Sequence, residues 1–489
     1  MLSFTKLMKQ IRTRFAPSPT GFLHVGGLRT ALYNYLFAKK NGGKFLLRIE
    51  DTDQNRIVEG AVENLISTLN WSGVDYDEGP YKEGDYGPYI QSQRLEIYKK
   101  HARQLVESGN AYQCFCTHER LEQVRAKQIE MHLPPSYDRL CRSLNPEQVI
   151  EKLINNTPHV IRMKIPLIGE ITFEDVVRGK VSIANKILDD QVIIKTDGFP
   201  TYHLAVVVDD HFMEISHVIR GEEWLPSTPK HILLYNFFGW EVPLFAHLPL
   251  LLNPDKSKLS KRQGDVAVED FKAKGFLKES IINFIALLGW HPSDDREIFS
   301  FDELINEFTL ERIGKSGAIF NIEKLQWLNQ QHIRKLSAEE IFILLKNEFD
   351  KEGWLKYPEE YILKVINLMK ERVLLLPDFV NLCKYFYEEP TSFTEESILK
   401  NWKDDSVNTI KSFVAELEKI TDFTSVKIEE SLKLFAVNIQ VKPGIIINPL
   451  RLLISGTNVG PSVFHMAELL GKTKVLARIN FGIQKLSSK

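Results

Sequence analysis

The sequence predicts an α/β fold in which a parallel-sheet domain is split by an α+β insertion and followed by an all-α C-terminal region. Three observations predict it. A strand, a turn, a helix and a second strand follow one another near the N-terminus, which is how a parallel α/β unit begins. Strand-like and helical segments return after residue 200, as if the unit were completed after an insertion. Beyond residue 300 almost every segment has the apolar spacing of an amphipathic helix.

The first domain opens with alternating apolar and polar residues, which predict a strand at Ile11–Ala16, and a proline-rich turn follows it. Apolar residues at helical spacing then predict a helix that begins near Leu28 and ends at Asn41-Gly42-Gly43. Lys44–Glu50 predicts a second strand, and a second helix follows at about 61–69. These four elements form the first half of the expected sheet domain.

The middle of the chain carries the predicted insertion. Residues 96–156 have a helical pattern with a break at two prolines, and 159–200 are rich in strand-like segments separated by glycine turns. Thr201–Val208 and Val218–Arg220 then have the apolar character of strands, and Pro229–Phe238 that of a helix. We therefore expect the second half of the sheet domain to begin near residue 201.

Length and composition exclude several classes of protein. A chain of 489 residues is too long for one hydrophobic core and predicts about three domains. The longest apolar runs, such as Ile281–Gly289, reach only about half the length that crosses a bilayer, which excludes a transmembrane protein. Four cysteines exclude a disulfide framework. The N-terminus lacks the apolar stretch of a secretory signal, so a cytoplasmic location is expected.

Charge is balanced over the chain but not along it. Lys and Arg number 62 and Asp and Glu 64, a net charge of −2, which gives no signature of nucleic-acid binding for the whole molecule. Residues 431–489, however, contain eight basic side chains and a single acidic one, that of Glu468. This basic end predicts either an arm that contacts phosphates or a solvated helical face, and charge alone favours the second.

Two short motifs have the chemistry of phosphate binding. His24-Val25-Gly26-Gly27 follows a strand and a turn, so its histidine and glycine amides lie at the start of a helix, where anions bind. Lys258-Leu259-Ser260-Lys261-Arg262 places three cations within five residues, which suits a clamp on a polyphosphate. Taken singly, the first is more often a helix start with a surface histidine and the second an exposed basic loop.

Together, the two motifs resemble the two signatures of class I aminoacyl-tRNA synthetases, and further blocks are similar to the glutamyl-tRNA synthetases of the bacterial type. The similarity extends from about residue 11 to the C-terminus and weakens after residue 330. Gly27 stands where many class I enzymes have a second histidine, and Val206 where some members carry an asparagine. The further blocks are Arg14–Gly21, Leu47–Asp53, Thr201–Leu204, Val208–Asp210, Val218–Trp224, Ala318–Phe320 and Lys324–Asn329.

The resemblance implies a Rossmann-type catalytic domain that binds ATP with Mg²⁺ and ligates L-glutamate to the 3′ end of tRNA(Glu) through a glutamyl-adenylate, releasing AMP and diphosphate. It also implies a monomer with no membrane partner. Its implied domains are two catalytic halves at 1–100 and 201–255, an inserted acceptor-stem-binding domain at 101–200, a stem-contact linking region at 256–330 and an α-helical anticodon-binding region at 331–489.

The resemblance also assigns site residues. It makes His24, Lys258 and Lys261 the catalytic residues, which bind the ATP phosphates and the charge that develops on the leaving diphosphate. The implied ATP-binding residues are Ala16, Pro17, Ser18, His24, Gly26, Gly27, Glu223, Trp224, Leu251, Lys258, Ser260 and Lys261. The implied glutamate-binding residues are Arg14, Ala16, Ser18, Glu50, Tyr202, Val206 and Arg220.

Chemistry distinguishes the roles around glutamate. The guanidinium fork matches a carboxylate in two places, so Arg14 and Arg220 are the expected readers of the side chain. Glu50 is the expected partner of the α-ammonium group. Two arginines leave the amide NH₂ of glutamine facing donors, which is how the site is expected to reject it.

Three of the four cysteines cluster in Cys114-Phe115-Cys116 and Cys141. Two thiolates in Cys-x-Cys can bind one ion, and the spacing resembles a zinc site of some glutamyl enzymes in which a tyrosine is the fourth ligand, here Tyr137. A histidine ligand used by others is replaced by Ser143. The alternative is a set of reduced cysteines on a surface insertion. Cys383, among apolar residues, is expected in a core.

Three rival functions remain from the sequence. A nucleotidyltransferase that acts without RNA and a truncated relative that glutamylates a modified base both share the motifs, but neither needs the helical residues 331–489. An inactive RNA-binding module is disfavoured by intact His24, Lys258 and Lys261. The sequence does not determine whether tRNA(Gln) is also charged.

Overall fold

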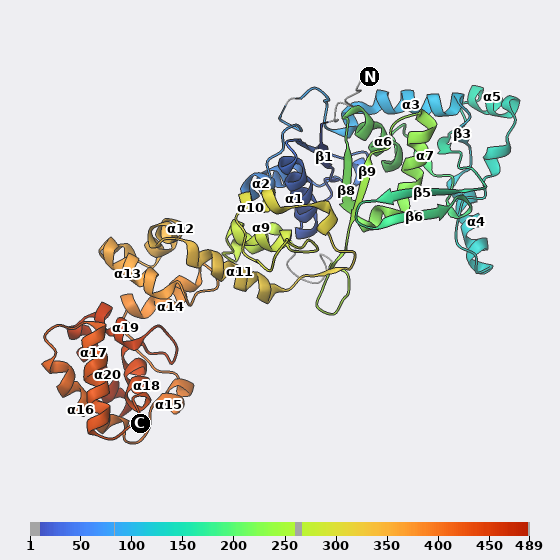
Figure 1. Cartoon of the computed structure of the whole chain (residues 1–489). Helices are drawn as coiled ribbons and strands as arrows, with labels where there is room; N and C mark the ends of the chain where they lie inside the picture. The colour runs from blue at the N-terminus through green and yellow to red at the C-terminus, as the bar shows by residue number, and fades with distance from the viewer. Residues whose placement is uncertain (1–9, 83, 260–266, 488–489) are drawn as a thin grey trace. The chain divides into compact units, whose positions relative to one another are not determined.

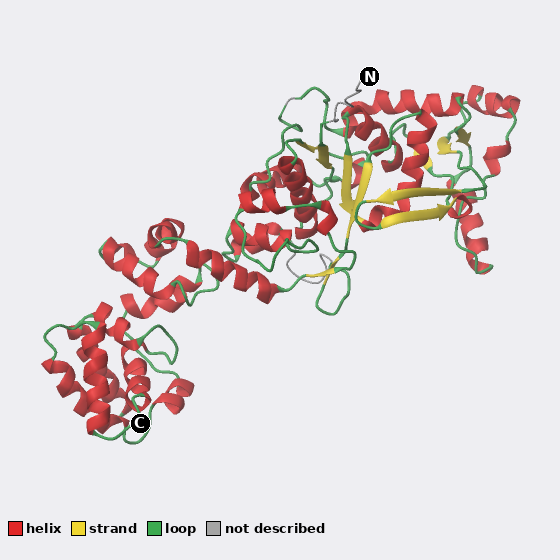
Figure 2. Cartoon of the chain, in the orientation of Figure 1, coloured by secondary structure: helices red, strands yellow, loops and turns green. Residues whose placement is uncertain are grey.

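The structure is a computed structural model that describes residues 10–82, 84–259 and 267–487. The chain forms two compact units. The first comprises Met1–Phe271 and Ile282–Asn321, and the second Lys272–Ile281 and Ile322–Lys489. The first unit mixes helices and strands, whereas every regular element described in the second is a helix (Figure 1, Figure 2). The predicted α/β part and helical C-terminal part are confirmed.

Short strands run through the first unit. They are β1 (Arg12–Phe15), β2 (Lys44–Leu47), β3 (Ala111–Cys114), β4 (Val160–Met163), β5 (Glu170–Asp175), β6 (Gly179–Ala184), β7 (Val192–Ile194), β8 (His217–Gly221), β9 (Leu244–Leu248), β10 (Leu251–Leu252) and β11 (Ala318–Ile319). Its helices are α1 (Val25–Lys40), α2 (Ala61–Ser72), α3 (Leu95–Glu107), α4 (His118–Glu130), α5 (Pro146–Ile154), α6 (Tyr202–Phe212), α7 (Thr228–Phe238) and α10 (Phe301–Glu307). Helices α8 (Val268–Ala273) and α9 (Lys278–Ala286) cross the boundary between the units.

The opening of the chain folds as the sequence predicts. β1 pairs with β2 in parallel, with Phe15 opposite Leu47, and α1 connects them. The backbone N–H of Ser216 donates to the carbonyl of Arg12 at 3.0 Å, so β8 begins beside the start of β1. β1 and β8 therefore begin side by side, and ligands of parallel α/β folds bind at the carboxyl ends of such strands.

The predicted insertion contributes to the same layer. β5 pairs in parallel with β9, with Asp175 opposite Phe245, and forms an antiparallel hairpin with β6. The hairpin turns at Gly179, whose φ of +77° a residue with a side chain adopts only with strain. The strand order β6-β5-β9-β8 thus joins insertion strands to the strands after residue 215 (Figure 1).

Two expectations about elements are wrong. Thr201–Val208 is not a strand but the first part of α6, because a short apolar run buried on all sides has the same pattern in either structure. The helical pattern predicted over 96–156 also conceals the strand β3, which pairs with β4 through Ala111 and Met163. In both cases tertiary packing decided the structure where the local pattern was ambiguous.

The second unit is a helical assembly around one apolar core. Its helices are α11 (Ile322–Lys335), α12 (Ala338–Lys351), α13 (Glu359–Met369), α14 (Asp378–Tyr387), α15 (Glu395–Asn401), α16 (Ser406–Lys419), α17 (Ser425–Asn438), α18 (Gly444–Ser455), α19 (Val463–Leu470) and α20 (Lys472–Leu486). Cys383 is buried in this core, as the sequence predicts. Among the described residues no helix is long and apolar enough to cross a membrane.

Part of the basic C-terminal charge has a structural use. Arg478 is buried and donates to the carbonyls of Tyr385 and Ile454, both at 2.7 Å. Arg451 donates to the carbonyl of Pro461 at 2.6 Å. These two guanidinium groups satisfy backbone acceptors at the ends of helices and loops. They fit neither the phosphate-contacting arm nor the solvated face.

Candidate active site

His24 caps the first turn of α1. Its backbone is extended, and its Nδ1 accepts a hydrogen bond from the N–H of Gly27 at 3.1 Å. A Cβ on Gly26 would lie 3.1 Å from the imidazole, and one on Gly27 would lie 2.7 Å from Leu23, so glycine lets the ring lie against the helix start. The amide of Gly27, predicted to bind phosphate, is therefore engaged by His24 in this structure.

The second phosphate motif begins beside β10. Lys258 is exposed and forms a backbone bridge with Leu252, and Leu259 N–H donates to the carbonyl of Leu251 at 2.9 Å. The predicted Ser260 and Lys261 lie outside the described residues. The chain resumes at Ala267, whose backbone bridges His24. Of the described residues on either side of this segment, Leu259 thus lies beside β10 and Ala267 beside His24.

The two motifs also meet at Leu251, a predicted ATP-binding residue. Its side chain lies 3.7 Å from where a Cβ on Gly26 would stand. Leu251 is buried, whereas Ser18, His24 and Glu223 are exposed. The sequence-distant segments near residues 24, 251 and 267 therefore form one continuous surface with accessible polar groups.

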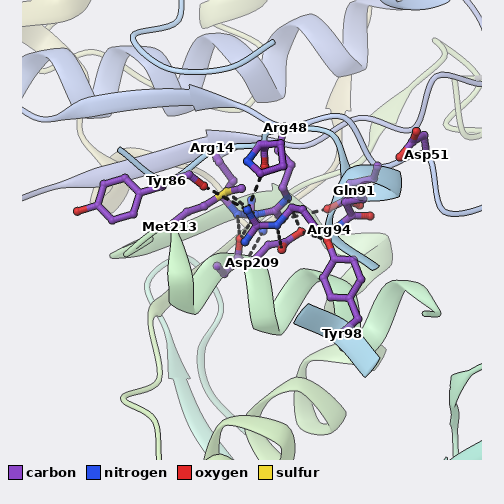
Figure 3. Close-up of polar contacts among 12 residues, drawn as sticks. Arg14, Arg48, Asp51, Tyr86, Gln91, Arg94, Tyr98, Asp209 and Met213 are labelled. Carbon is purple, nitrogen blue, oxygen red and sulfur yellow. Dashed lines mark hydrogen bonds and ion pairs between the residues drawn. The ribbon is translucent and has the colours of Figure 1, made fainter. Parts of the chain in front are cut away.

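A buried network of charges lies beneath the loop that precedes α1 (Figure 3). We call it the compensated cluster, because its three guanidinium groups face three carboxylates. Its members are Arg14, Arg48, Arg94, Glu50, Asp209 and Asp210. Arg14 lies in β1, Arg48 follows β2, Arg94 ends the turn before α3, and Asp209 lies in α6.

Arg48 is at the centre of the compensated cluster and is fully buried. Its guanidinium donates to Asp210 at 2.7 Å and to Glu50 at 3.0 Å. Arg14 forms a two-point contact with Asp210, at 3.1 and 3.2 Å. Asp209 accepts from Arg94 at 2.7 Å. Each buried charge thus has an opposite charge within reach, which is the condition for burying ions at tolerable cost.

The pKa values follow from this arrangement. Burial alone would lower the pKa of Arg48, but Asp210, Glu50 and Asp209 raise it well above its ordinary value. Burial would raise the pKa of Asp210, but Arg14 and Arg48 bring it below its ordinary value. Burial raises the pKa of Glu50, with Arg48 opposing.

Arg220 lies in a different environment. It is buried at the end of β8, and its guanidinium contacts side chains from α6, α7 and β9. We call Arg220 and these neighbours the Arg220 pocket. The contacts are Tyr202 Oη at 2.9 Å, Thr228 Oγ1 at 2.9 Å, His247 Nε2 at 3.1 Å, His231 Nδ1 at 3.3 Å and the carbonyl of Trp224 at 3.5 Å.

No carboxylate among the described residues forms an ion pair with Arg220. Its five N–H donors point at five neutral acceptors, so the positive charge is hydrogen-bonded but not neutralised. A buried cation of this kind is costly unless an anion arrives. The pocket is therefore suited to a carboxylate ligand.

The histidines of the Arg220 pocket are neutral. Burial, followed by the charge of Arg220, holds the pKa of His231 well below its ordinary value. Burial, helped by Lys230 and Arg220, lowers the pKa of His203 to about 3, and His203 lies 3.1 Å from His231. Burial also lowers the pKa of His247, although Asp175 opposes. The three histidines therefore add no positive charge to that of Arg220 at neutral pH.

The other residues that were predicted to bind glutamate or ATP lie in different environments. The ring of Tyr202 lies tilted against that of Trp224, with centroids 4.4 Å apart, and its hydroxyl accepts from Arg220. The carbonyl of Pro17 accepts from Glu50 N–H at 3.0 Å, which joins the loop to the compensated cluster. Ala16 is half-buried beside Pro17. Val206 is buried in the core cluster around α6, so its side chain offers packing only.

The cysteines converge in the inserted region. The sulfurs of Cys114, Cys116 and Cys141 lie within 4.8 Å of one another, and those of Cys116 and Cys141 are 3.5 Å apart. The hydroxyl of Tyr137 lies 3.2 Å from Cys114 and 3.6 Å from Cys116. Zinc bonded to sulfur at about 2.3 Å in a tetrahedron separates its sulfurs by about 3.8 Å. The donor set therefore fits a Zn²⁺ ion.

Zinc binds thiolates rather than thiols. The hydrogen bond with Cys141 lowers the pKa of Cys114, with burial opposing. The guanidinium of Arg162 lies 3.9 Å from the ring centroid of Tyr137 and adds a positive charge beside the cluster.

Sequence reasoning did not assign several residues that the structure brings to the site. Arg48, Asp209 and Asp210 stood inside quoted blocks without a role, yet two adjacent acids in an apolar run could have indicated buried ion pairs. Asp175, Thr228, His231 and His247 had no local signal, since they meet Arg220 only through sheet and helix packing.

Comparison with known proteins agrees with this architecture. A family model described as tRNA synthetases class I (E and Q), catalytic domain, matches residues 10–327, and one described as Anticodon binding domain matches 333–483. A glutamate–tRNA ligase of Chlorobaculum parvum is 52% identical over 98% of this chain and 99% of that protein. One of Chloroherpeton thalassium is 51% identical over 97% and 98%.

Solved structures are similar as well. The crystal structure of a glutamate tRNA ligase from Elizabethkingia meningosepticum, in complex with its amino acid, has a TM-score of 0.89 and 42% identity over 97% of this chain and 99% of its own. The glutamate–tRNA synthetase of Elizabethkingia anophelis has a TM-score of 0.88 and 42% identity over 97% and 100%. The similarity thus includes both units.

Proposed function

Because the chain belongs to the class I tRNA synthetases of the glutamate and glutamine group, we propose that it ligates L-glutamate to the 3′ end of tRNA(Glu). The α-carboxylate of glutamate attacks the α-phosphate of ATP, diphosphate leaves, and glutamyl-adenylate forms. A hydroxyl of the terminal adenosine of the tRNA then attacks the activated carbonyl, and AMP leaves. Neither step needs a covalent enzyme nucleophile, so catalysis is alignment and charge stabilisation.

One observation carries this proposal. Arg220 is a buried cation with five neutral partners at the carboxyl end of β8, and the two phosphate motifs follow β1 and β10. A carboxylate that enters this pocket neutralises the charge. Such a ligand lies at the edge of a parallel sheet where nucleotides also bind. An amino acid with an acidic side chain, activated by ATP, satisfies both conditions.

The ATP phosphates are proposed to bind at the start of α1 and under the loop after β10. His24 lies at the positive end of the helix dipole. Lys258, together with Ser260 and Lys261, would bind the diphosphate as it leaves, because their ammonium and hydroxyl groups stabilise the negative charge that develops on it. Ala16, Pro17, Ser18, Gly26, Gly27, Glu223, Trp224 and Leu251 complete the proposed ATP site.

Glutamate is proposed to bind between the two charge networks. Arg220 binds the side-chain carboxylate with Tyr202, and Glu50 binds the α-ammonium. Arg14 is already held by Asp210, so we assign it a weaker part in side-chain recognition than Arg220. The amide of glutamine would point an NH₂ group at an all-donor guanidinium, which leaves donors unpaired and disfavours it.

Mg²⁺ accompanies ATP and offsets the negative charge of the phosphates. We propose in addition that Zn²⁺ binds Cys114, Cys116, Cys141 and Tyr137, where it would join β3 to the segment before α5. Its role would be structural. Metal analysis of protein purified without chelators is expected to give one zinc per chain, and protein free of zinc would contradict the assignment.

The partners follow from the two units. The inserted region at 101–200 is proposed to bind the acceptor end of tRNA(Glu), 256–330 to contact its stem, and 331–489 to recognise its anticodon, in agreement with the matching anticodon-binding family model. We also propose that the enzyme works as a monomer in the cytoplasm. A solution mass equal to that of one chain tests the first of these two points.

Charging assays test the proposed function. Purified enzyme with ATP and glutamate is expected to glutamylate tRNA(Glu), and a parallel assay with tRNA(Gln) establishes whether it also charges that species. Exchange of labelled diphosphate into ATP is expected only when tRNA is present. Exchange that is independent of tRNA would favour a nucleotidyltransferase instead, and absence of charging would contradict the proposal.

A further inference from the structure

Arg220 and His247 are neighbours because their strands are in register. β8 and β9 are parallel, and Arg220 pairs directly with His247. The Nε–H of Arg220 donates to Nε2 of His247 at 3.1 Å, and both side chains are buried. Register alone therefore sets the two side chains beside each other on one face of the sheet.

The contact determines the tautomer of His247. A guanidinium has only donors, so the Nε2 of His247 must be the acceptor and cannot carry a hydrogen. In a neutral imidazole the hydrogen is then on Nδ1. This nitrogen lies 2.6 Å from a carboxylate oxygen of Asp175, which accepts it.

Asp175 is itself held firmly at the end of β5. Its second oxygen accepts from the backbone N–H groups of Val177 at 3.0 Å and Arg178 at 2.8 Å. Burial would raise the pKa of Asp175, but the hydrogen bonds from the His247 side chain and from the backbone of Arg178 bring it below its ordinary value. Asp175 is therefore a fixed acceptor, and it forces one orientation and one tautomer on His247.

The other side of Arg220 follows the same rule. Nδ1 of His231 faces Arg220, so its hydrogen is on Nε2, which points at Nδ1 of His203 at 3.1 Å. Both imidazoles are acceptors toward the guanidinium. Every group that holds Arg220 is thus a neutral acceptor, and the orientation of the fork depends on these acceptors keeping their tautomers.

We propose that Asp175 and His247 are positioning residues for Arg220, and that through it they set the preference for glutamate over glutamine. The inference rests on the proposed function. Asp175 holds the Nδ1–H tautomer of His247, and His247 aims the guanidinium at the incoming carboxylate. If the tautomer reverses, an N–H faces an N–H, and Arg220 turns away from the position in which both of its ends can meet a carboxylate.

Two substitutions of His247 separate its two contacts. His247→Gln keeps an acceptor near the position of Nε2 and loses the donor to Asp175. His247→Asn keeps a donor near the position of Nδ1 and loses the acceptor for Arg220. The proposal expects the glutamate KM of His247→Asn to rise at least about tenfold, since a hydrogen bond to a charged group is lost. The glutamate KM of His247→Gln stays within about threefold, and the KM for ATP changes in neither.

Asp175→Asn tests whether Asp175 determines the tautomer of His247. The amide oxygen still accepts from the backbone, but the NH₂ group faces Nδ1 of His247 and reverses its tautomer, so glutamate KM is expected to rise about as much as in His247→Asn. The His247→Gln variant has no imidazole and therefore no tautomer to reverse. In this background Asp175→Asn is expected to raise the glutamate KM by less than about a further twofold. An effect of Asp175→Asn that persists in full in that background would overturn the proposal.

Three further measurements keep the test decisive. His101→Gln, on a buried ring that packs against Phe212 and Trp240, is the control for histidine substitution and is expected to leave glutamate kinetics unchanged. Thermal unfolding shows that each variant is folded. The ratio of kcat/KM for glutamate over glutamine is expected to fall in His247→Asn and Asp175→Asn, and an unchanged ratio with a raised KM would contradict the role in specificity.

A readout without substrate distinguishes this proposal from the proposed function. Nitrogen-15 NMR of labelled histidine reports which imidazole nitrogen carries the hydrogen, and loss of a signal in His247→Gln identifies His247. The Nδ1–H form is expected in the wild type and the Nε2–H form in Asp175→Asn. Failure of the wild type to charge tRNA(Glu) would count against the proposed function, whereas the Nε2–H form in the wild type would overturn the positioning role alone.

Discussion

Two groups of buried arginines lie in the same unit and differ in how their charge is met. In the compensated cluster, Arg48 contacts Asp210 at 2.7 Å and Glu50 at 3.0 Å, and Arg94 contacts Asp209 at 2.7 Å. In the Arg220 pocket the guanidinium is as deeply buried but contacts two histidines, a threonine, a tyrosine and a carbonyl. One network is complete without a ligand, and the other is short of one negative charge.

The difference distinguishes structural from substrate-binding arginines. A balanced cluster joins β1, α3 and α6 and costs stability when one member is removed, because a charge is then left buried alone. A buried cation without an anionic partner already has this unfavourable free energy, and the binding of an anion offsets it. Substitutions of Arg48, Arg94 or Asp209 in the first network should therefore affect folding, and those in the second should affect glutamate recognition.

The largest effect on stability is expected for Asp209→Asn. It removes the negative charge between Arg94 and Arg48, and breaking a buried ion pair costs about 3–5 kcal/mol. Urea unfolding measures the loss. Asp77→Asn, in a half-buried pair with Lys39, is the matched control and is expected to cost less than half as much. Equal losses in the two variants would show that the cluster is not specially stabilising.

A smaller effect on the free energy of unfolding is expected when the pH is lowered, because of a histidine beside the Arg220 pocket. The pKa of His203 is about 3 in the folded chain and about 6.5 when unfolded, so below about pH 6.5 the unfolded state binds the proton first and stability falls as pH falls. Between about pH 7.5 and about pH 5.5 the wild type should lose about 1.4 kcal/mol more than His203→Gln. Equal losses in urea unfolding would contradict the neutral histidine.

A further step down, Tyr202→Phe removes one of the five acceptors of Arg220 and a hydroxyl that can donate to a bound carboxylate. The glutamate KM is expected to rise about fivefold, which corresponds to about 1 kcal/mol. The KM for ATP should not change, because the aromatic ring remains beside Trp224. A rise in both constants would indicate instead that the ring has moved.

The smallest effect is expected in the stability of Arg220→Ala. The substitution loses several hydrogen bonds and some packing, but it also removes an uncompensated buried charge, so the free energy of unfolding should change by less than about 1 kcal/mol. Urea unfolding beside Asp209→Asn makes the contrast direct. A loss as large as that of Asp209→Asn would mean that Arg220 is a structural residue.

Local sequence signals predicted the helices and strands whose ends carry capping or turn-forming residues. Helix α1 has a capping histidine at one end and Asn41 followed by glycines at the other, and the structure places it at Val25–Lys40. β1, β2 and α7 also had clear patterns. The segment at Thr201–Val208 did not, because its apolar run is buried in either a strand or a helix, and only packing made it α6.

The sequence predicted those residues of the candidate site that stand in recognisable motifs. His24, Arg220 and the cysteines stood in recognisable blocks, and the structure brings the cysteines together. His247 and Asp175 could not be found in this way. Their proximity to Arg220 depends on the register of β8 with β9 and of β5 with β9, and register is a property of the whole sheet rather than of a short segment.

The central claim is that Arg220 supplies the positive charge that the side chain of glutamate neutralises. The most direct test is diphosphate exchange with Arg220→Ala in the presence of tRNA(Glu), with glutamate and ATP varied separately. We expect kcat/KM for glutamate to fall at least about a hundredfold, as for loss of a buried charge partner, while the KM for ATP is unchanged. Glutamate kinetics close to those of the wild type would contradict the account.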